Sequence, residues 1–539
     1  MLEAYCLRTE YRENPLGLDT KKPRLGWKLR SDNANVMQIA YRLQFSSNLH
    51  FTNVTWDSGR TETSQSQHVR HDGLELKSAE RVYWRVKVWC SHGEESSYSR
   101  PSYFETGLLE ASDWKARWIE PEKEVDPDAY KPAPYIRKEF SVKKGLVSAR
   151  AYLTAKGLYG FYLNGVEGTD FLFTPGFTSY HHRLQYQAYD VTSLLKEGAN
   201  ALGVVLGDGW WRGRTGGADL KNNFGYKLAF LGQLLLEYDD GSREIVGSDG
   251  TFKASRGPLL KSDMKAGEIY DARINMEGWN EPGFDDSAWE PVHVTEDGLD
   301  NLIATRSVPV REKERFTPKV LRTPNGETVL DFGQNIAGWV DMKVRGEAGT
   351  EIVLIHGEAL DKHGNFTLSN LSEHGTLEDF QEVHYILAGK GEERYRPKFS
   401  IFGFRYVLVK NYPGDVTSDN FTAVAVYSDL GETGDFTCSN PLLNKLVSNS
   451  RWSQKSNFME VPTDCPTRER AGWTGDAQVF SRTAADFMNA YPFFEKWMSD
   501  LAVEQFQDGS VGSTVPTVLG YHNLEEWERL SKTSANPMM

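Results

Sequence analysis

The spacing of apolar residues changes near residue 430, and this change limits the folds open to the chain. Before it, apolar side chains recur at every second position, the period of a half-buried strand, as at Val82, Trp84, Val86, Val88 and Cys90. After it, they recur at steps of three and four, the period of an amphipathic helix. Strands and helices that follow one another in series indicate separate domains. The sequence therefore predicts a multidomain protein, all-β followed by all-α.

A chain of 539 residues is too long for one hydrophobic core, so we expect three or four domains. Residues 1–107 are predicted to form a small sandwich of the immunoglobulin or fibronectin-III type, with Ile39, Tyr41, Leu43 and Phe45 alternating along one strand. An acidic, proline-rich stretch at 120–134 is predicted by its composition to be a connecting segment, and a second β region is assigned to residues 108–317. A third β region at 318–428 is predicted to be a larger sandwich, and helices follow at 429–539.

Local signals refine these regions. Asn164-Gly165 predicts a tight hairpin turn, and Asp190 is predicted to cap a short helix that reaches Gly198. Ser439-Asn440-Pro441 predicts the start of a longer helix. The apolar faces predicted for this helix and the two after it are Leu443, Leu446, Val447 and Trp452; Val479, Phe480, Thr483 and Phe487; and Phe493, Trp497 and Leu501, with the last helix ending at Asp508-Gly509.

Charge and cysteine content exclude several classes of protein. The formal net charge of −14 argues against a nucleic-acid binder and against docking on an anionic membrane. Four cysteines without a CxxC spacing make a disulfide framework or a cysteine zinc site unexpected, and we predict no metal. We see no signal peptide and no apolar stretch long enough to span a bilayer, and so expect a cytoplasmic protein. The oligomeric state is left open.

One loop, residues 461–476, is unusually dense in polar groups. It lies between two predicted helices, and such loops commonly carry catalytic groups. Carboxylates close to one another raise the pKa of at least one of them, and protonating a glycosidic oxygen requires a neutral carboxylic acid. The alternative is a surface ion-pair cluster around a helix start. The residues concerned are Asp464, Arg468, Glu469, Arg470, Trp473 and Asp476.

Two adjacent tryptophans, Trp210 and Trp211, stand among glycines in the segment GDGWWRG (207–213). Exposed aromatic faces can stack on the C–H faces of pyranose rings, so this pair is a candidate sugar platform. The alternative is that the rings plug a corner of the sandwich, because large aromatic side chains are usually buried.

The run PTDCPTRERAGWTGDAQ (462–478) closely resembles the signature of bacterial α-L-rhamnosidases of glycoside hydrolase family 78. Upstream segments resemble the accessory β-sandwich domains of that family in their expected order, and the resemblance extends to about residue 520. These segments are AKGLYGFYLNG (155–165), GDGWWRG, DFGQNIAGW (331–339), HGEAL (356–360) and FGFRY (402–406).

The resemblance implies an enzyme that hydrolyses terminal α-L-rhamnosyl linkages with inversion, without a metal or organic cofactor. It implies a jelly-roll-like domain at 108–317, a concanavalin-like domain at 318–428 and an (α/α)6 barrel from 429. The general acid falls on Glu469, and sugar-binding residues fall on Asp464, Arg468 and Asp476, with Trp473 in the sugar pocket. The implied partner is a rhamnose-containing glycoside or polysaccharide.

The helical region is short for such a barrel, which needs about 300 residues, whereas roughly 110 follow residue 430. We therefore expect an incomplete, truncated barrel without the second carboxylate that inversion requires as a base. An open barrel would expose the face of Phe493, Trp497 and Leu501. Residues 1–539 alone would then hydrolyse little or no aryl rhamnoside.

Further glutamates near the end, Glu525, Glu526 and Glu528, are interpreted as a solvated face of a helix at 524–530. Two other functions stay open. The first alternative to an enzyme is a non-catalytic carbohydrate-binding β-sandwich protein with a vestigial helical tail. The third reading is a structural fragment that binds no ligand.

Overall fold

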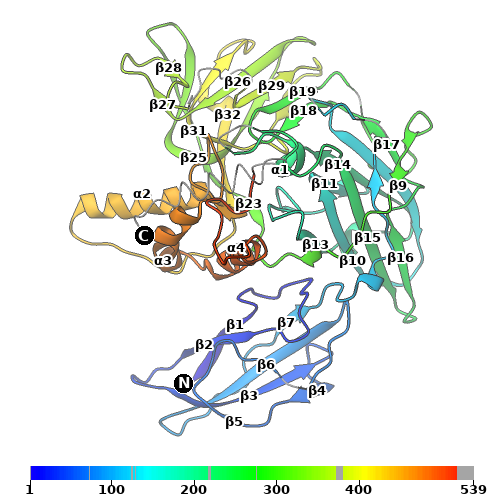
Figure 1. The fold of residues 1–539 in the computed structure, drawn as a ribbon, viewed down its shortest axis with the longest axis vertical. Helices are drawn as coiled ribbons and strands as arrows, with labels where there is room; N and C mark the ends of the chain where they lie inside the picture. Colours follow the sequence, from blue (N-terminus) through cyan, green and yellow to red (C-terminus); the bar gives the residue numbers. More distant parts are fainter. Residues whose placement is uncertain are drawn as a thin grey trace.

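The computed structural model describes residues 2–71, 73–122, 125–127, 129–216, 220–274, 276–371 and 380–518. Figure 1 shows a small sandwich at the N-terminus, two larger β regions above it, and helices gathered beside the upper one. The strands β1 to β32 precede the long helices α2, α3 and α4, which fit part of a barrel of helical hairpins. The predicted fold class, all-β followed by all-α, is confirmed.

The N-terminal region contains a two-stranded and a five-stranded sheet, the latter in the order β4-β3-β6-β7 with β5 paired to β3. Strand β6 buries every second side chain, as its sequence predicts. The prediction for Ile39 is wrong. This side chain is 41% exposed because the pairing register of β3 with β6 shifts between Gln38 and Ala40. The strands are β1 (Glu3–Thr9), β2 (Leu25–Arg30), β3 (Gln38–Ser46), β4 (Val54–Asp57), β5 (Thr61–Glu62), β6 (Arg81–Cys90) and β7 (Ser102–Glu105).

The second β region packs a seven-stranded sheet, β21-β8-β15-β10-β13-β22 with β16 on β15, against a six-stranded sheet, β12-β11-β14-β9-β17-β20. The strands are β8 (Ile119–Glu120), β9 (Pro134–Val142), β10 (Leu146–Lys156), β11 (Leu158–Leu163), β12 (Val166–Glu167), β13 (Leu184–Asp190), β14 (Gly198–Gly207), β15 (Ala229–Tyr238), β16 (Arg243–Gly247), β17 (Lys253–Arg256), β20 (Glu290–Pro291), β21 (His293–Val294) and β22 (Leu302–Ala304).

Two local predictions fall in this region. The hairpin at Asn164-Gly165 is confirmed, because both residues have positive φ, 53° and 84°, and join β11 to β12. The helix predicted from Asp190 to Gly198 is reduced to one 3-10 turn, Thr192–Leu194. Asn200 accounts for this difference, since its side chain hydrogen-bonds both the N–H and the C=O of Lys196 and so turns the chain into β14.

The third β region is a ten-stranded sheet in the order β18-β19-β29-β26-β31-β25-β32-β23, with β24 and β30 also paired to β25. Strands β18, β19 and β23 come from before residue 318, so this sheet includes chain from the predicted second domain. The strands are β18 (Leu259–Asp263), β19 (Gly267–Asp271), β23 (Val310–Phe316), β24 (Lys319–Arg322), β25 (Thr328–Val344), β26 (Glu351–Gly357), β29 (Glu382–Ile386), β30 (Glu393–Tyr395), β31 (Phe402–Lys410) and β32 (Phe421–Ser428), beside the small pair β27 (Ala359–Leu360) and β28 (Phe366–Thr367).

The helices are α1 (Gly209–Arg212), α2 (Pro441–Asn457), α3 (Thr474–Phe487) and α4 (Tyr491–Val503), with short strands β33 (Phe458–Met459) and β34 (Val461–Pro462) between α2 and α3. The predicted start of α2 is confirmed, because the Asn440 side chain accepts a hydrogen bond from Leu442 N (2.9 Å). Helix α4 ends at Val503, before the predicted stop at Asp508-Gly509. Among the described residues, no helix is long and apolar enough to cross a membrane.

The buried faces predicted for two of these helices are confirmed only in part, at Trp452 on α2 and at Phe480 and Phe487 on α3, which pack against core clusters. Leu443 and Leu446 are 46% and 59% exposed on α2, and Val479 is 81% exposed on α3. Helix α2 packs on β25 and β32 instead through its last turns, where Gln454 and Lys455 are buried. An apolar stripe predicts the buried face of a helix only when the neighbouring structure lies on that side.

On α4 the discrepancy is the opposite one, since side chains expected to be exposed are buried. Phe493 and Trp497, which we expected to be exposed, are 0% and 3% exposed, and Phe493 stacks on Phe458 with ring centroids 4.5 Å apart. One continuous core joins Trp497 to side chains of both larger β regions, such as Phe177 and Trp339. The helix predicted at 524–530, with Glu525, Glu526 and Glu528, lies outside the described residues.

Candidate active site

The 461–476 loop is anchored to the ten-stranded sheet by Arg470. This residue has a positive φ of 56° and is 7% exposed. Its guanidinium donates to the backbone oxygens of Ile401 (2.7 Å), Met264 (3.0 Å) and Thr467 (3.1 Å). The side chain is therefore part of the framework that positions its neighbours. Its sequence neighbourhood contains no sign of this role, because two of its partners lie 69 and 206 residues away.

Glu469, the predicted general acid, is half-buried on this loop. Its Oε2 accepts a hydrogen bond of 2.9 Å from the indole Nε1 of Trp473, and its own backbone N–H donates to Cys465 Sγ (3.3 Å). The structure thus brings Glu469 and Trp473 together. Trp473 holds the carboxyl group in place, in addition to any contact its ring makes with a ligand.

Asp464 lies at the base of the loop and closes it. Its backbone N–H donates to Ala471 O (3.2 Å), and its Oδ1 accepts from Ala471 N (3.1 Å). Burial raises the pKa of the Asp464 carboxyl above its ordinary value, against the opposing effect of hydrogen bonds from Cys465 and Ala471. The sequence predicted a raised pKa from the closeness of the carboxylates to one another, whereas the cause at Asp464 is burial.

The two other predicted sugar-binding residues, Arg468 and Asp476, lie on either side of Glu469 and Trp473 in the chain. Arg468 is half-buried in the turn immediately before Glu469, and Asp476 is exposed in the first turn of α3. A carboxylate in that position is favoured by the partial positive charge of the helix start. All five predicted residues therefore lie on one loop and the helix turn that follows it, while their roles toward a sugar stay predictions.

A second segment, 512–515, closes the other side of the loop. Thr474 N donates to Ser513 O and Val515 N donates to Gly472 O, both at 2.9 Å, while Trp497 Nε1 donates to Val515 O (2.8 Å). A Cβ on Gly472 would lie 2.1 Å from Val515 O, so no larger residue fits. Gly472 is thus required by close packing, which the sequence alone did not indicate.

The tryptophan pair on α1 is not a sugar platform. Trp210 is 3% exposed and stacks on Phe177 with ring centroids 5.0 Å apart and planes 1° apart. Trp211 is half-buried and donates to Lys227 O (2.9 Å). The alternative, that these rings plug a corner of the β structure, is confirmed.

Within the described part of the chain, no three His, Cys, Asp or Glu side chains are grouped as a metal site. The four cysteines, Cys6, Cys90, Cys438 and Cys465, are free thiols.

Four family models match the chain in series. Residues 4–110 match a Rha78A-like N-terminal immunoglobulin domain, and 144–314 match an α-L-rhamnosidase N-terminal domain. Residues 321–427 match a bacterial α-L-rhamnosidase concanavalin-like domain. The candidate loop falls within the last match, 431–534, to a bacterial α-L-rhamnosidase six-hairpin glycosidase domain.

Individual relatives agree with these models. An α-L-rhamnosidase of Formosa agariphila is 33% identical over 524 residues, 92% of this chain and 55% of its own. One of Alteromonas sp. (strain LOR) is 36% identical over 94% of this chain and 56% of its own. The crystal structure of the Streptomyces avermitilis α-L-rhamnosidase complexed with L-rhamnose superimposes with a TM-score of 0.91 at 30% identity, covering 96% of this chain and 66% of that one. The chain thus spans little more than half the length of the first two relatives.

Proposed function

The chain belongs to the bacterial α-L-rhamnosidase family, and from this premise we propose that it acts on terminal α-L-rhamnosyl linkages, with Glu469 as the general acid. The observation that carries the proposal is the contact between Glu469 and Trp473 on the anchored loop. A general acid must be held in a fixed orientation toward the oxygen that it protonates. The indole N–H and the Arg470 anchor together supply that orientation.

The proposed reaction is hydrolysis with inversion. Glu469, in its neutral form, gives its proton to the glycosidic oxygen as the bond to the anomeric carbon breaks. A water molecule attacks that carbon from the opposite face, and a second carboxylate takes a proton from the water. The Trp473 N–H donates to the Glu469 carboxyl throughout, and this hydrogen bond strengthens when the group becomes a carboxylate.

The proposed ligand is a rhamnose-containing glycoside or polysaccharide. Asp464, Arg468 and Asp476 are proposed to hydrogen-bond the sugar hydroxyls, since carboxylates accept and a guanidinium donates in fixed directions. The rhamnose complex of the Streptomyces avermitilis relative supports this class of sugar. That support is for the sugar alone, and the linkage and the aglycone are left open.

Turnover of p-nitrophenyl α-L-rhamnoside by residues 1–539 tests the assignment of Glu469 as the general acid. The expectation is a low rate, because the proposal assigns the acid on this chain and leaves the base unassigned. Any measured rate should fall at least about 100-fold in Glu469→Gln, the usual contribution of a general acid. Proton NMR of the first product should show the β-anomer of rhamnose. An unchanged rate in Glu469→Gln, or the α-anomer as first product, contradicts the proposal.

Binding tests the remaining residues and the alternative function. Calorimetry with L-rhamnose should show weakened binding in Asp464→Asn and Arg468→Met, and nearly unchanged binding in Glu469→Gln. A non-catalytic carbohydrate-binding protein predicts the same binding without any turnover. A structural fragment predicts neither. The family match favours the enzyme, and the turnover assay separates the three.

A further inference from the structure

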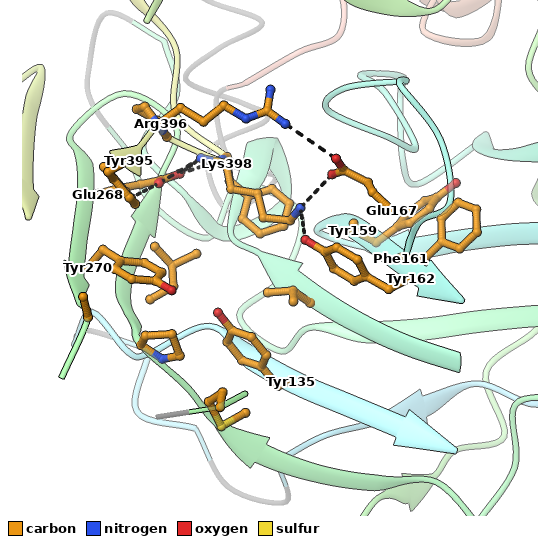
Figure 2. A pocket seen from close by; sticks show the side chains of 18 of the residues that line it. Tyr135, Tyr159, Phe161, Tyr162, Glu167, Glu268, Tyr270, Tyr395, Arg396 and Lys398 are labelled. Atoms are coloured by element: carbon orange, nitrogen blue, oxygen red, sulfur yellow. Dashed lines mark hydrogen bonds and ion pairs between the residues drawn. The ribbon is translucent and has the colours of Figure 1, made fainter. Parts of the chain in front are cut away.

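A second polar and aromatic site lies away from the 461–476 loop. It is a cavity of about 620 Å³ between the six-stranded and ten-stranded sheets, shown in Figure 2. This volume is within the usual range for a small-ligand pocket. The sequence alone gives no sign of this cavity, because its walls come from strands far apart in the chain. The aromatic residues that line it include Tyr135, Tyr162, Tyr270, Trp279, Trp339 and Tyr385.

The aromatic wall is built in a fixed arrangement. Tyr270 on β19 stacks on Tyr385 of β29, with ring centroids 5.8 Å apart and planes 18° apart. On the other side, Trp279 meets Tyr135 and Tyr162 edge-on, at 5.0 and 5.7 Å. Figure 2 shows Tyr135, Tyr162 and Tyr270 facing one another across the cavity. Such rings present flat apolar surfaces with polar hydroxyls at their edges.

Charged side chains on the wall neutralise one another. Lys398 Nζ donates to the Tyr162 hydroxyl (2.7 Å) and pairs with Glu167 Oε1 (3.2 Å). Arg396 Nη2 lies 3.5 Å from the other Glu167 oxygen, as Figure 2 shows. The fully buried Glu268 accepts from the Tyr395 hydroxyl (2.7 Å) and from the backbone N–H of Lys398 (2.9 Å). The cavity therefore offers directed donors and acceptors without an unpaired charge among these groups.

Two further details show that the wall is specifically built. A Cβ on Gly160 would lie 2.6 Å from Lys398 Cε, so the bare strand leaves room for Lys398 to reach Tyr162. Trp339 is fully buried in the wall, and its Nε1 has no hydrogen-bond partner among the described residues. An unpaired buried indole N–H costs free energy unless a ligand or water supplies an acceptor.

We propose that this cavity is a second carbohydrate-binding site, which takes a neutral oligosaccharide. A sugar has apolar C–H faces that match the stacked tyrosines and hydroxyls that match the Glu167, Arg396 and Lys398 group. An acidic sugar fits less well, because Arg396 and Lys398 already pair with Glu167, and Arg396 pairs with Glu312 as well. The site does not depend on the proposed hydrolysis, and it would hold part of a glycan away from the loop that carries Glu469.

The test uses rutinose, a neutral disaccharide, with residues 1–539. Binding is measured by calorimetry and located by hydrogen exchange. We expect rutinose to slow amide hydrogen exchange in segments 267–271 and 393–399. Tyr270→Leu should weaken the rutinose binding that causes this protection at least tenfold. The matched control is Tyr226→Leu, a 45% exposed tyrosine outside the cavity, which should change the affinity less than twofold.

Glu167→Gln sharpens the test without removing an aromatic ring. This variant removes the carboxylate partner of Lys398, while Arg396 keeps its ion pair with Glu312. Digalacturonic acid, an acidic disaccharide, should therefore bind the variant more tightly than it binds the unchanged chain. A merely structural role for Glu167 would not produce this change in preference, and the measurement stands even where Tyr270→Leu fails to fold.

Other outcomes overturn the inference. These are protection confined to residues 461–476, unchanged rutinose affinity in a folded Tyr270→Leu, an unchanged affinity of Glu167→Gln for digalacturonic acid, or no rutinose binding. Asp464→Asn separates the two sites, because it should leave the protection of 267–271 and 393–399 unchanged. Loss of that protection in Asp464→Asn assigns rutinose to the loop and contradicts the cavity. Failure of the Glu469 assay alone would leave the cavity result intact.

Discussion

Two groups of mixed charges adjoin the short strand β34, and they differ in what surrounds them. On the loop after β34, Glu469 stays half-buried beside Trp473. Beneath α4, by contrast, Lys496 and Asp500 are 0% exposed and Glu460 is 6% exposed. Lys496 Nζ donates to Glu460 O (3.1 Å) and lies 3.3 Å from Asp500 Oδ2, and Arg183 pairs with Asp500 at 3.0 Å. Both groups mix carboxylates with cations, but only the loop leaves its carboxylate open to a ligand.

This contrast in burial shows that a cluster of charges in the sequence does not by itself indicate a catalytic site. In the group beneath α4 the charges satisfy one another and link α4 to the β structure. On the loop, one arginine, Arg470, is used for anchoring, and the other groups are arranged around an accessible carboxyl. Burial and pairing, rather than composition, separate a structural charge cluster from a candidate active site.

The largest predicted effect comes from breaking the buried group. Lys496→Met leaves Glu460 buried without its cation and Asp500 with Arg183 alone, which should lower the free energy of unfolding by about 3–5 kcal/mol. Urea titration followed by tryptophan fluorescence measures the change. Lys445→Met on the exposed surface of α2 is the control and should change it by less than about 0.5 kcal/mol. A loss below about 1 kcal/mol for Lys496→Met would contradict the structural role assigned to this group.

A smaller effect compares the two arginines of the loop. Arg470→Gln removes charged hydrogen bonds to Ile401, Met264 and Thr467, and should destabilise the protein by about 2–3 kcal/mol. Arg468→Gln should change the stability by less than about 0.5 kcal/mol while weakening the binding of L-rhamnose. Urea titration and calorimetry on the same samples measure both. Equal stability losses in the two variants would remove the distinction between anchor and ligand-binding residue.

The smallest effect concerns pH. Because burial raises the pKa of Asp464 in the folded protein, the folded state keeps this proton at pH values where the unfolded chain has lost it. Stability contributed by this group is therefore lost as pH rises from the ordinary value of 3.8 through the raised pKa. The Asn side chain has no such dependence, so Asp464→Asn should gain stability relative to the unchanged chain as pH rises from 4 to 7.

Asp57 in the N-terminal region supplies a control of opposite sign. Hydrogen bonding from Arg42 lowers the pKa of Asp57 to about 2, so its stabilisation is present above pH 3.8 and is lost as pH falls toward 2. Asp57→Asn should therefore lose stability relative to the unchanged chain above pH 4, and less so at lower pH. Thermal unfolding of both variants across this range checks the signs. Parallel curves for Asp464→Asn and the unchanged chain would contradict the raised pKa.

Local sequence signals predicted local structure well. The alternation of β6, the Asn164-Gly165 hairpin and the Asn440 cap of α2 all occur as predicted. Each depends on residues within a few positions of one another, so the responsible forces act within a single strand, turn or helix end. The five candidate residues of the loop also lie together, because they are close in the chain.

Predictions that depended on distant partners were less successful. The exposed Leu446 and Val479 contradict the faces expected from periodicity, and the buried Phe493 and Trp497 contradict the exposure expected from an open barrel. A helical pattern identifies an apolar stripe, but the elements that cover a helix come from elsewhere in the chain. The cavity between the sheets was missed for the same reason, since Tyr162 and Tyr270 are more than a hundred residues apart.

The order of strands and helices, the family and the loop that carries Glu469 could all be predicted from the sequence. The anchoring of this loop by Arg470, the contact of Trp473 with Glu469 and the structural role of the charges around Lys496 became evident only in the folded chain. These two sets differ in the range of the interactions involved. Periodicity, turns and caps arise from neighbouring residues, whereas burial, pKa shifts and buried ion pairs depend on side chains that only folding brings together.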